Sequence, residues 1–219
     1  DLKHTLKFVE IVKNYVGGLK LGLEFFTKNG IAGVEKLKKY GLPIFLDLKF
    51  NDIPNTVNRA ASNVLSLNPE YLTIHINGGR RMIEGIASIK KKTKIIGVTM
   101  LTSLDNRDLV DLCIEEKSSE YVKKLSLLGQ KSGLDGVVSS VSELKVLKQA
   151  MPENFIFVTP GINFKMQNKD QKRTSNPGEA IKSGSSILII GRTITMSSDP
   201  LKVLMEINQE ITKNNVSSN

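Results

Sequence analysis

The sequence predicts an α/β protein, a (β/α)8 TIM barrel in a single domain over residues 1–219, from three observations. Short apolar segments, often with β-branched residues, alternate along the chain with longer segments that have helical spacing. Such βα repetition implies a parallel sheet covered by helices. Polar residues stand at the ends of several apolar segments, where the catalytic groups of barrels gather. The length of 219 residues suits one domain of this kind.

Seven apolar segments are expected to be strands, because each is short and lies between longer helical segments. They cover residues 18–22, 43–49, 71–75, 94–101, 136–139, 155–159 and 187–191. A closed barrel needs eight strands, since a gap would leave two unpaired edges. We therefore expect a first strand before residue 1, with Asp1 at its C-terminal end. The alternative is an open, doubly wound sheet of seven strands.

Eight segments with apolar residues at helical spacing are expected to be helices. They cover residues 5–15, 30–40, 56–67, 81–90, 121–131, 141–150, 178–182 and 200–210. The connection over residues 161–177 is long, polar and rich in Lys, Asn and Gln. A long connection inside a compact domain is typical of an active-site lid or a disordered segment, and we expect a lid.

The chain is basic, with a formal net charge of +9, but its composition does not favour a nucleic-acid partner. It has no Trp, only 5% aromatic residues and no recognisable nucleic-acid motif. A lysine-decorated surface explains the charge, and a small substrate that carries phosphate would also suit it. Residues 1–219 contain no apolar run long enough to span a bilayer and no charged-then-apolar stretch of the kind that forms a signal segment. We expect a cytoplasmic protein without a membrane partner.

The chain has few soft metal ligands. These are His4, His75 and Cys113, so we do not expect a structural zinc site. The single cysteine excludes an internal disulfide and fits a reducing compartment. His75 is expected to be a core or rim histidine, and neither a ligand nor a base.

Residues 45–56, FLDLKFNDIPNT, hold the strongest signal for a functional site. Asp47 and Lys49 are two residues apart in a predicted strand, so period-2 geometry points both side chains to one face. Burying charges in an apolar strand costs several kcal/mol unless they have partners or a purpose. This segment is therefore a candidate site, although a purely structural ion-pair network is the alternative.

The run DLKFNDIPNT, residues 47–56, resembles the signature of the orotidine 5′-phosphate decarboxylase family. Further segments that resemble this family follow the same order and span nearly the whole chain; they begin at Lys20, His75, Val98, Leu134, Val158, Asp170 and Ile190. The Asp-x-Lys-x-x-Asp spacing alone is shared with sugar-phosphate lyases of the same barrel group. The complete set of segments is much more specific.

The resemblance implies a cofactor-independent enzyme that converts orotidine 5′-monophosphate to uridine 5′-monophosphate and carbon dioxide. Lys49 then corresponds to the general acid that protonates C6 of the pyrimidine, and Asp47 to the carboxylate near the departing carboxylate. Lys20 corresponds to the lysine that completes a Lys-Asp-Lys-Asp array and binds the ribose region. In such an array, each lysine stays protonated because it is paired with a carboxylate.

The resemblance also implies a homodimer whose sites are shared. Asp52, the second aspartate of the array, and Thr56 correspond to residues supplied to the neighbouring subunit's site. Asp1 corresponds to a ribose-binding aspartate. Residues that correspond to positions holding the base or the phosphate are Thr102, Gln171, Gly191 and Arg192.

Two positions depart from the family pattern. Asn163 stands where many members have an arginine that contacts phosphate, so that contact is expected to be weaker or to come from Lys165 or Lys172. Asn51 replaces a common histidine inside the central motif. Two other functions remain open: a sugar-phosphate lyase of the hexulose-phosphate synthase type, which often uses a metal ion, and a catalytically silent basic binding protein.

Overall fold

The computed structural model of the protein describes residues 2–164 and 175–216. Its sheet has seven parallel strands in sequence order, and these confirm the seven predicted ones: β1 (Leu19–Gly22), β2 (Ile44–Phe50), β3 (Tyr71–His75), β4 (Lys94–Val98), β5 (Gly136–Val138), β6 (Ile156–Thr159) and β7 (Ile187–Leu188). β4 and β7 are shorter than expected. Within the described ranges β1 and β7 form the two edges of the sheet, and the strand expected before residue 1 stays a prediction.

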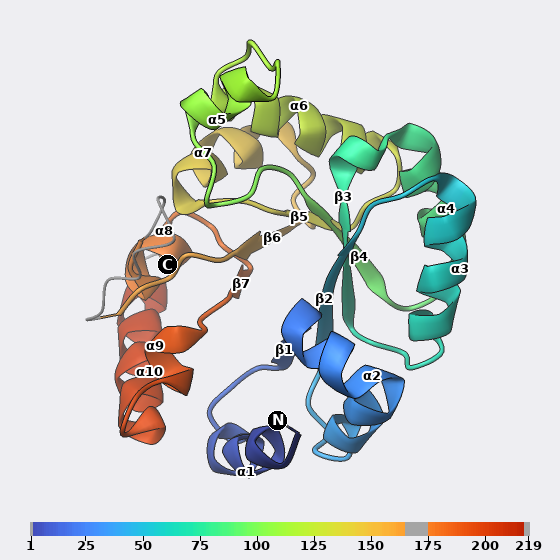
Figure 1. Ribbon diagram of the computed structural model, residues 1–219. Helices are drawn as coiled ribbons and strands as arrows, with labels where there is room; N and C mark the ends of the chain where they lie inside the picture. The colour runs from blue at the N-terminus through green and yellow to red at the C-terminus, as the bar shows by residue number, and fades with distance from the viewer. Residues whose placement is uncertain (1, 165–174, 217–219) are drawn as a thin grey trace.

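The helices follow the strands, and eight of them overlap the predicted ones, although the second helix begins at Leu23 and not at residue 30. They are α1 (Leu2–Val12), α2 (Leu23–Lys38), α3 (Pro54–Leu65), α4 (Arg80–Ile89), α5 (Asn106–Asp111), α6 (Ser118–Lys131), α7 (Val141–Ala150), α8 (Pro177–Lys182), α9 (Arg192–Thr195) and α10 (Pro200–Val216), with a short 3₁₀ turn at Ile76–Gly78. The sheet curls and the helices surround its outer side, as Figure 1 shows. This is the arrangement of a (β/α)8 barrel and not of a doubly wound sheet.

The short helices α5 and α9 were not predicted. α5 begins at an Asp105 N-cap, whose carboxylate accepts from the backbone N–H of Arg107, while the Asp108 carboxylate accepts from the N–H of Asp105. This capping box satisfies backbone donors that would otherwise have no partner. Asp-x-x-Asp at residues 105–108 was therefore a sequence signal for a helix start.

Alternate residues of the strands pack on opposite sides of the sheet. Leu46, Leu72 and Ile95 belong to the larger apolar cluster, together with residues of the surrounding helices. Phe45 and Ile96, their neighbours in sequence, belong to a separate cluster together with Val158. A sheet with apolar side chains on both faces is typical of a parallel barrel with a packed interior.

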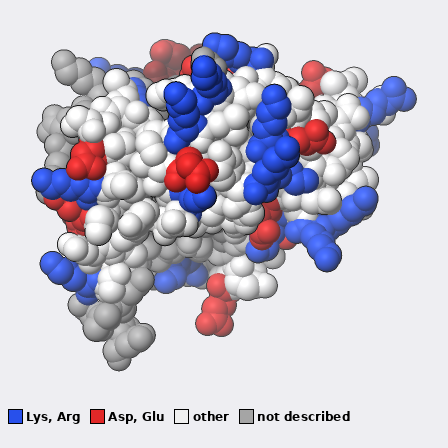
Figure 2. Space-filling view, turned by 90° about the horizontal axis from the view of Figure 1, so that it is seen from below, with Lys and Arg blue, Asp and Glu red and all other residues white. Residues whose placement is uncertain are grey.

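The charged surface has no single dominant patch in the view of Figure 2, where Asp and Glu are interspersed among Lys and Arg. This agrees with the interpretation of the net charge of +9 as a lysine-decorated surface. None of the helices described is long and apolar enough to cross a membrane.

Candidate active site

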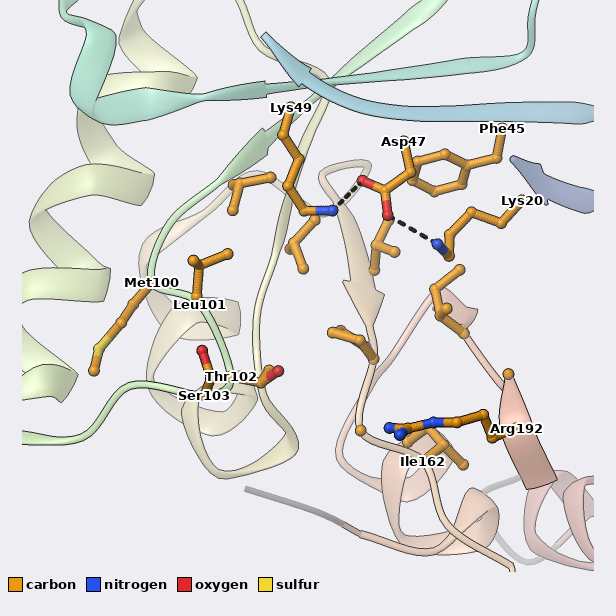
Figure 3. Close-up of a pocket in the computed structure, with 17 residues that line it drawn as sticks. Lys20, Phe45, Asp47, Lys49, Met100, Leu101, Thr102, Ser103, Ile162 and Arg192 are labelled. Carbon is orange, nitrogen blue, oxygen red and sulfur yellow. Dashed lines mark hydrogen bonds and ion pairs between the residues drawn. The ribbon is translucent and has the colours of Figure 1, made fainter. Parts of the chain in front are cut away.

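A cavity of about 370 Å³ opens at the C-terminal ends of the strands, and Figure 3 shows the side chains around it. Charged groups line it from β1, β2 and the segment after β7. The lining comprises Lys20, Phe45, Asp47, Lys49, Val98, Met100, Leu101, Thr102, Ser103, Val138, Val158, Pro160, Gly161, Ile162, Ile189, Gly191 and Arg192. Six of the predicted site residues are thus brought to one cavity, the size of a small-molecule pocket.

Asp47 lies between two lysines in this cavity. Its Oδ2 atom is 2.9 Å from Lys20 Nζ, and its Oδ1 atom is 2.8 Å from Lys49 Nζ. The Asp47 side chain is 13% exposed, whereas the two lysine side chains are 32% and 30% exposed. One carboxylate shared by two ammonium groups leaves the cluster with a net charge of +1 beside the cavity.

The segment that holds this cluster is not a regular strand. The sequence predicted regular strand geometry for it and did not predict the irregularity that the structure shows. Leu46 is paired with Leu72, but the next pair is Phe50 with Ile74, so three residues of β2 lie opposite Thr73 alone. Lys49 has a φ of 50°, in the left-handed region that L-residues seldom adopt. Asp47 and Lys49 do meet, as predicted, but across a β-bulge. Bulges often re-aim side chains next to active sites.

Thr73, in the middle of β3, contacts both ends of the bulge. Its hydroxyl donates to Asp47 Oδ1 at 3.0 Å and accepts from the backbone N–H of Lys49 at 2.9 Å. The residue is fully buried. Sequence analysis missed Thr73, although its position two residues before His75, in an otherwise apolar strand, was an available signal.

The charge cluster sets the protonation of its neighbours. Burial raises the pKa of Asp47, but the ammonium groups of Lys20 and Lys49 outweigh burial and hold that pKa below its ordinary value. The pKa of His75, at the end of β3, is lowered by burial and by the nearby Lys49 charge, while Asp47 acts in the opposite direction. Asp47 is therefore held as a carboxylate and His75 as a neutral imidazole at neutral pH.

The other side of the cavity is formed by residues after β4 and β7. Arg192 begins α9, and Figure 3 shows it across the cavity from the three charged groups; Thr102 and Ser103 also line the cavity. Gly191 precedes it at the helix start, and a Cβ atom added there would have no neighbour within 4 Å. The backbone is therefore open to a close approach by a ligand, and the guanidinium group has the planar donor geometry that suits phosphate oxygens.

The remaining predicted residues lie elsewhere. Asp52 and Thr56 are exposed and are not among the described residues that line the cavity. The Asp52 carboxylate accepts from the N–H of Ile53 at 2.6 Å. The fourth charge of the predicted array is therefore not brought to the other three within this chain.

Several predictions fall on parts of the chain that the structure does not describe. Asp1, Gln171 and the two lysines offered as phosphate contacts, Lys165 and Lys172, lie outside the described residues, as does most of the predicted lid. Asn163 is described, and its backbone N–H donates to the carbonyl of Ser175. Within the described ranges, no group of three or more His, Cys, Asp or Glu side chains is arranged to hold a metal ion.

A parallel barrel with a charged cavity at the C-terminal ends of its strands defines a (β/α)8 enzyme. Comparison with known proteins gives the particular family. Residues 1–207 match the model of the family described as Orotidine 5′-phosphate decarboxylase / HUMPS. The chain belongs to this family.

Individual relatives agree with the family match. An orotidine 5′-phosphate decarboxylase of Ehrlichia canis (strain Jake) is 46% identical over 206 residues, which cover 93% of this chain and 90% of the relative. The crystal structure of an orotidine 5′-phosphate decarboxylase from Lactobacillus acidophilus is 32% identical with a TM-score of 0.78, and covers 94% of this chain and 93% of its own. The crystal structure of an uncharacterized conserved protein from Geobacillus kaustophilus has a TM-score of 0.83 at 31% identity, with coverage of 96% and 95%.

Proposed function

We propose that this protein decarboxylates orotidine 5′-monophosphate to uridine 5′-monophosphate and carbon dioxide, a step of pyrimidine biosynthesis, without a metal or cofactor. The observation that carries the proposal is the Asp47 carboxylate held between the ammonium groups of Lys20 and Lys49, at 2.9 and 2.8 Å, on the wall of one cavity. The names of the relatives and the family match support the same activity.

The reaction needs fixed positive charge at the reacting carbon. When the bond between C6 and the carboxyl carbon breaks, its electron pair stays on C6 as a vinyl carbanion that no adjacent carbonyl delocalises. The Lys49 ammonium stabilises this charge and delivers a proton to C6, and the resulting amine regains a proton from solvent. Two unit charges about 4 Å apart interact by roughly 4 kcal/mol at an effective dielectric constant near 20.

Asp47 and Lys20 complete this part of the site. In the proposed complex Asp47 faces the departing carboxylate, and its negative charge is paired with the ammonium groups of both lysines. Because Lys20 Nζ contacts the other oxygen of the same carboxylate, it fixes Asp47 from the side opposite Lys49. In the proposed complex Lys20 also binds the ribose region.

The phosphate of the substrate lies at the opposite side of the cavity. Gly191 and Arg192 bind it there, after the last strand, where barrels commonly bind phosphate. Thr102 and Gln171 hold the base or the phosphate, and Asp1 binds the ribose. Because the phosphate is remote from C6, its binding energy is available to organise the site.

The fourth charge comes from a second subunit in this proposal. Asp52 and Thr56 are exposed outside the cavity of their own chain, which agrees with their donation to a neighbouring site in a homodimer. Residues 1–219 act as one domain in the cytoplasm, without nucleic-acid or membrane partners.

The direct test is the loss of orotidine 5′-monophosphate absorbance on addition of the protein, measured with and without EDTA. Turnover that continues in EDTA is expected. Turnover that stops with EDTA and returns with a divalent cation contradicts the metal-free mechanism. No turnover in either condition contradicts the proposed activity.

The shared site has its own test. Asp47→Asn and Asp52→Asn variants are each expected to be inactive alone. Mixing them is expected to restore part of the activity, because a mixed dimer has one site with both native aspartates. A mixture that stays as inactive as its components, although the subunits have exchanged, contradicts the donation of Asp52.

A further inference from the structure

The backbone at the bulge needs a partner that a regular parallel sheet does not offer. In a regular ladder, the N–H groups of one strand donate to carbonyl groups of the next. Asp47, Leu48 and Lys49 lie opposite the single residue Thr73, so the usual pairing is interrupted there. The Lys49 N–H donates instead to the Thr73 hydroxyl at 2.9 Å. A side chain thus takes the place of a ladder carbonyl.

The direction of both hydrogen bonds of Thr73 is fixed. A hydroxyl has one hydrogen to donate and two lone pairs to accept with, whereas a backbone N–H only donates and an ionised carboxylate only accepts. The Thr73 hydroxyl therefore accepts from Lys49 N–H and gives its one hydrogen to Asp47 Oδ1, at 3.0 Å. Thr73 is fully buried, so no solvent competes for either bond.

These two bonds act on the two groups that the proposed reaction uses. Asp47 Oδ1 accepts from Thr73 and also from Lys49 Nζ at 2.8 Å, which defines the position of the carboxylate relative to the ammonium group. Lys49 holds a left-handed backbone conformation, with φ at 50°, and such a conformation persists only where its surroundings over-determine it. The hydroxyl supplies one of these constraints.

We propose that Thr73 is a positioning residue: its hydroxyl bridges the bulge and holds Asp47 and Lys49 in the geometry that decarboxylation requires. This inference rests on the proposed function. A hydroxyl that only stabilised the fold would affect the melting temperature, whereas a positioning hydroxyl also affects kcat, with little effect on the binding of the phosphoribosyl part of the substrate.

The test replaces Thr73 by Val, which keeps the branched shape and removes only the hydroxyl, and by Ser, which keeps the hydroxyl. Thr73→Val is expected to lower kcat roughly 100-fold, because small displacements of catalytic groups have effects of this size. KM and the dissociation constant of uridine 5′-monophosphate are expected to change by less than about threefold, since ground-state contacts remain. Thr73→Ser is expected to keep kcat within about threefold of the wild type.

Thr93 provides the matched control at the other end of the strands. Its buried hydroxyl donates to the carbonyl of Pro69 at 2.8 Å, just before β4 begins, away from the cavity lining. Thr93→Val is expected to lower the melting temperature and to leave kcat unchanged. If Thr73→Val does not fold, the pair Thr73→Ala and Thr73→Ser repeats the comparison, and only the Ser variant is expected to keep kcat.

Three outcomes overturn the proposal: a Thr73→Val variant with wild-type kcat, a Thr73→Ser variant as impaired as Thr73→Val, or an equal loss of kcat in Thr93→Val. Each presupposes that the wild-type protein turns over orotidine 5′-monophosphate in the same assay. A wild-type protein without turnover contradicts the proposed function itself, and the two failures are therefore distinguishable.

Discussion

The two ends of the barrel both carry lysine–carboxylate pairs, yet the pairs are built differently. At the N-terminal end of the strands, Lys90 Nζ is 2.7 Å from the Asp135 carboxylate, and Lys94 Nζ is 3.1 Å from Glu70. At the C-terminal end, the single carboxylate of Asp47 serves two lysines at distances of 2.8 and 2.9 Å. The distances are similar, so distance alone does not distinguish a structural pair from one in the proposed active site.

Charge balance and backbone geometry do distinguish the two ends. Each lysine at the N-terminal end has a carboxylate to itself, which gives a net charge of zero, whereas the Asp47 cluster keeps an excess of one positive charge. Asp47 is also less exposed, at 13%, than Asp135, at 28%. An uncompensated charge beside a cavity has a cost for folding, and a strained bulge adds to that cost. Such features persist where they serve an anionic substrate.

The largest expected effect comes from Lys49→Ala. In the proposed mechanism the Lys49 ammonium lies about 4 Å from the developing carbanion, so its removal is expected to forfeit roughly 4 kcal/mol. This corresponds to about a 1,000-fold loss in kcat before the loss of the proposed proton donor is counted. Absorbance assays and circular dichroism measure activity and fold. Lys94→Ala, at the opposite end of the barrel, is the matched control and is expected to keep wild-type kcat. Near-normal turnover in Lys49→Ala contradicts the proposed acid.

A smaller effect is expected from Arg192→Ala, because this residue contacts the substrate phosphate and not the reacting carbon in the proposed complex. Loss of a charge-assisted hydrogen bond is worth about 1.5–3 kcal/mol, so KM is expected to rise roughly 10- to 100-fold. Steady-state kinetics measure the change. In the wild type, inorganic phosphite can occupy the anion site that a substrate without its phosphate group leaves empty. If added phosphite has no effect on the turnover of that truncated substrate, phosphate binding does not drive catalysis here.

At the N-terminal end, Asp135→Asn is expected to affect stability and not activity. The substitution removes the ion pair with Lys90, while the amide oxygen still accepts from the N–H of Ile95, which Asp135 Oδ2 contacts at 2.8 Å. Partly exposed pairs contribute little, so the free energy of unfolding is expected to fall by about 1 kcal/mol or less. Urea denaturation measures it. A loss of kcat in this variant would show that the two ends of the barrel are coupled.

The difference between the two ends also explains what the sequence could predict. Alternation of apolar segments predicted all seven strands and the curled parallel sheet, because burial of strand faces is a local pattern. It also predicted that Asp47 and Lys49 meet. The bulge could not be predicted from the sequence, because the register shift between Leu46 and Phe50 arises from pairing with a strand more than twenty residues away. No glycine or proline between these two residues marks the irregularity.

The same limit applies to single residues of the site. Thr73 was missed because its importance lies in the two groups it contacts, and both are distant in sequence. Asp52 was predicted as part of the array from a family resemblance, and the structure of one chain leaves it exposed, outside the cavity. A sequence pattern identifies which residues belong to a site, but it does not supply the tertiary and subunit contacts that assemble them.

The smallest expected effect is a pH dependence of the free energy of unfolding, which arises at the C-terminal end of the strands. Burial and the Lys49 charge lower the pKa of His75, so below about pH 6.5 the unfolded chain takes up a proton that the folded protein resists. The free energy of unfolding therefore falls as the pH decreases from 6.5. His75→Gln is expected to flatten this decline, measured by urea denaturation between pH 7 and pH 5.

His4→Gln is the matched control, because it removes the chain's other histidine, which lies on the exposed side of α1. Equal slopes for His75→Gln and the wild type contradict the influence of the cluster on His75. A flatter slope in the His75 variant, together with an unaltered response to the same pH change in Asp135→Asn, places this electrostatic sensitivity at the cavity. In that case the unbalanced charge of the Asp47 cluster affects the protonation of His75, whereas the balanced pairs at the other end have no such effect.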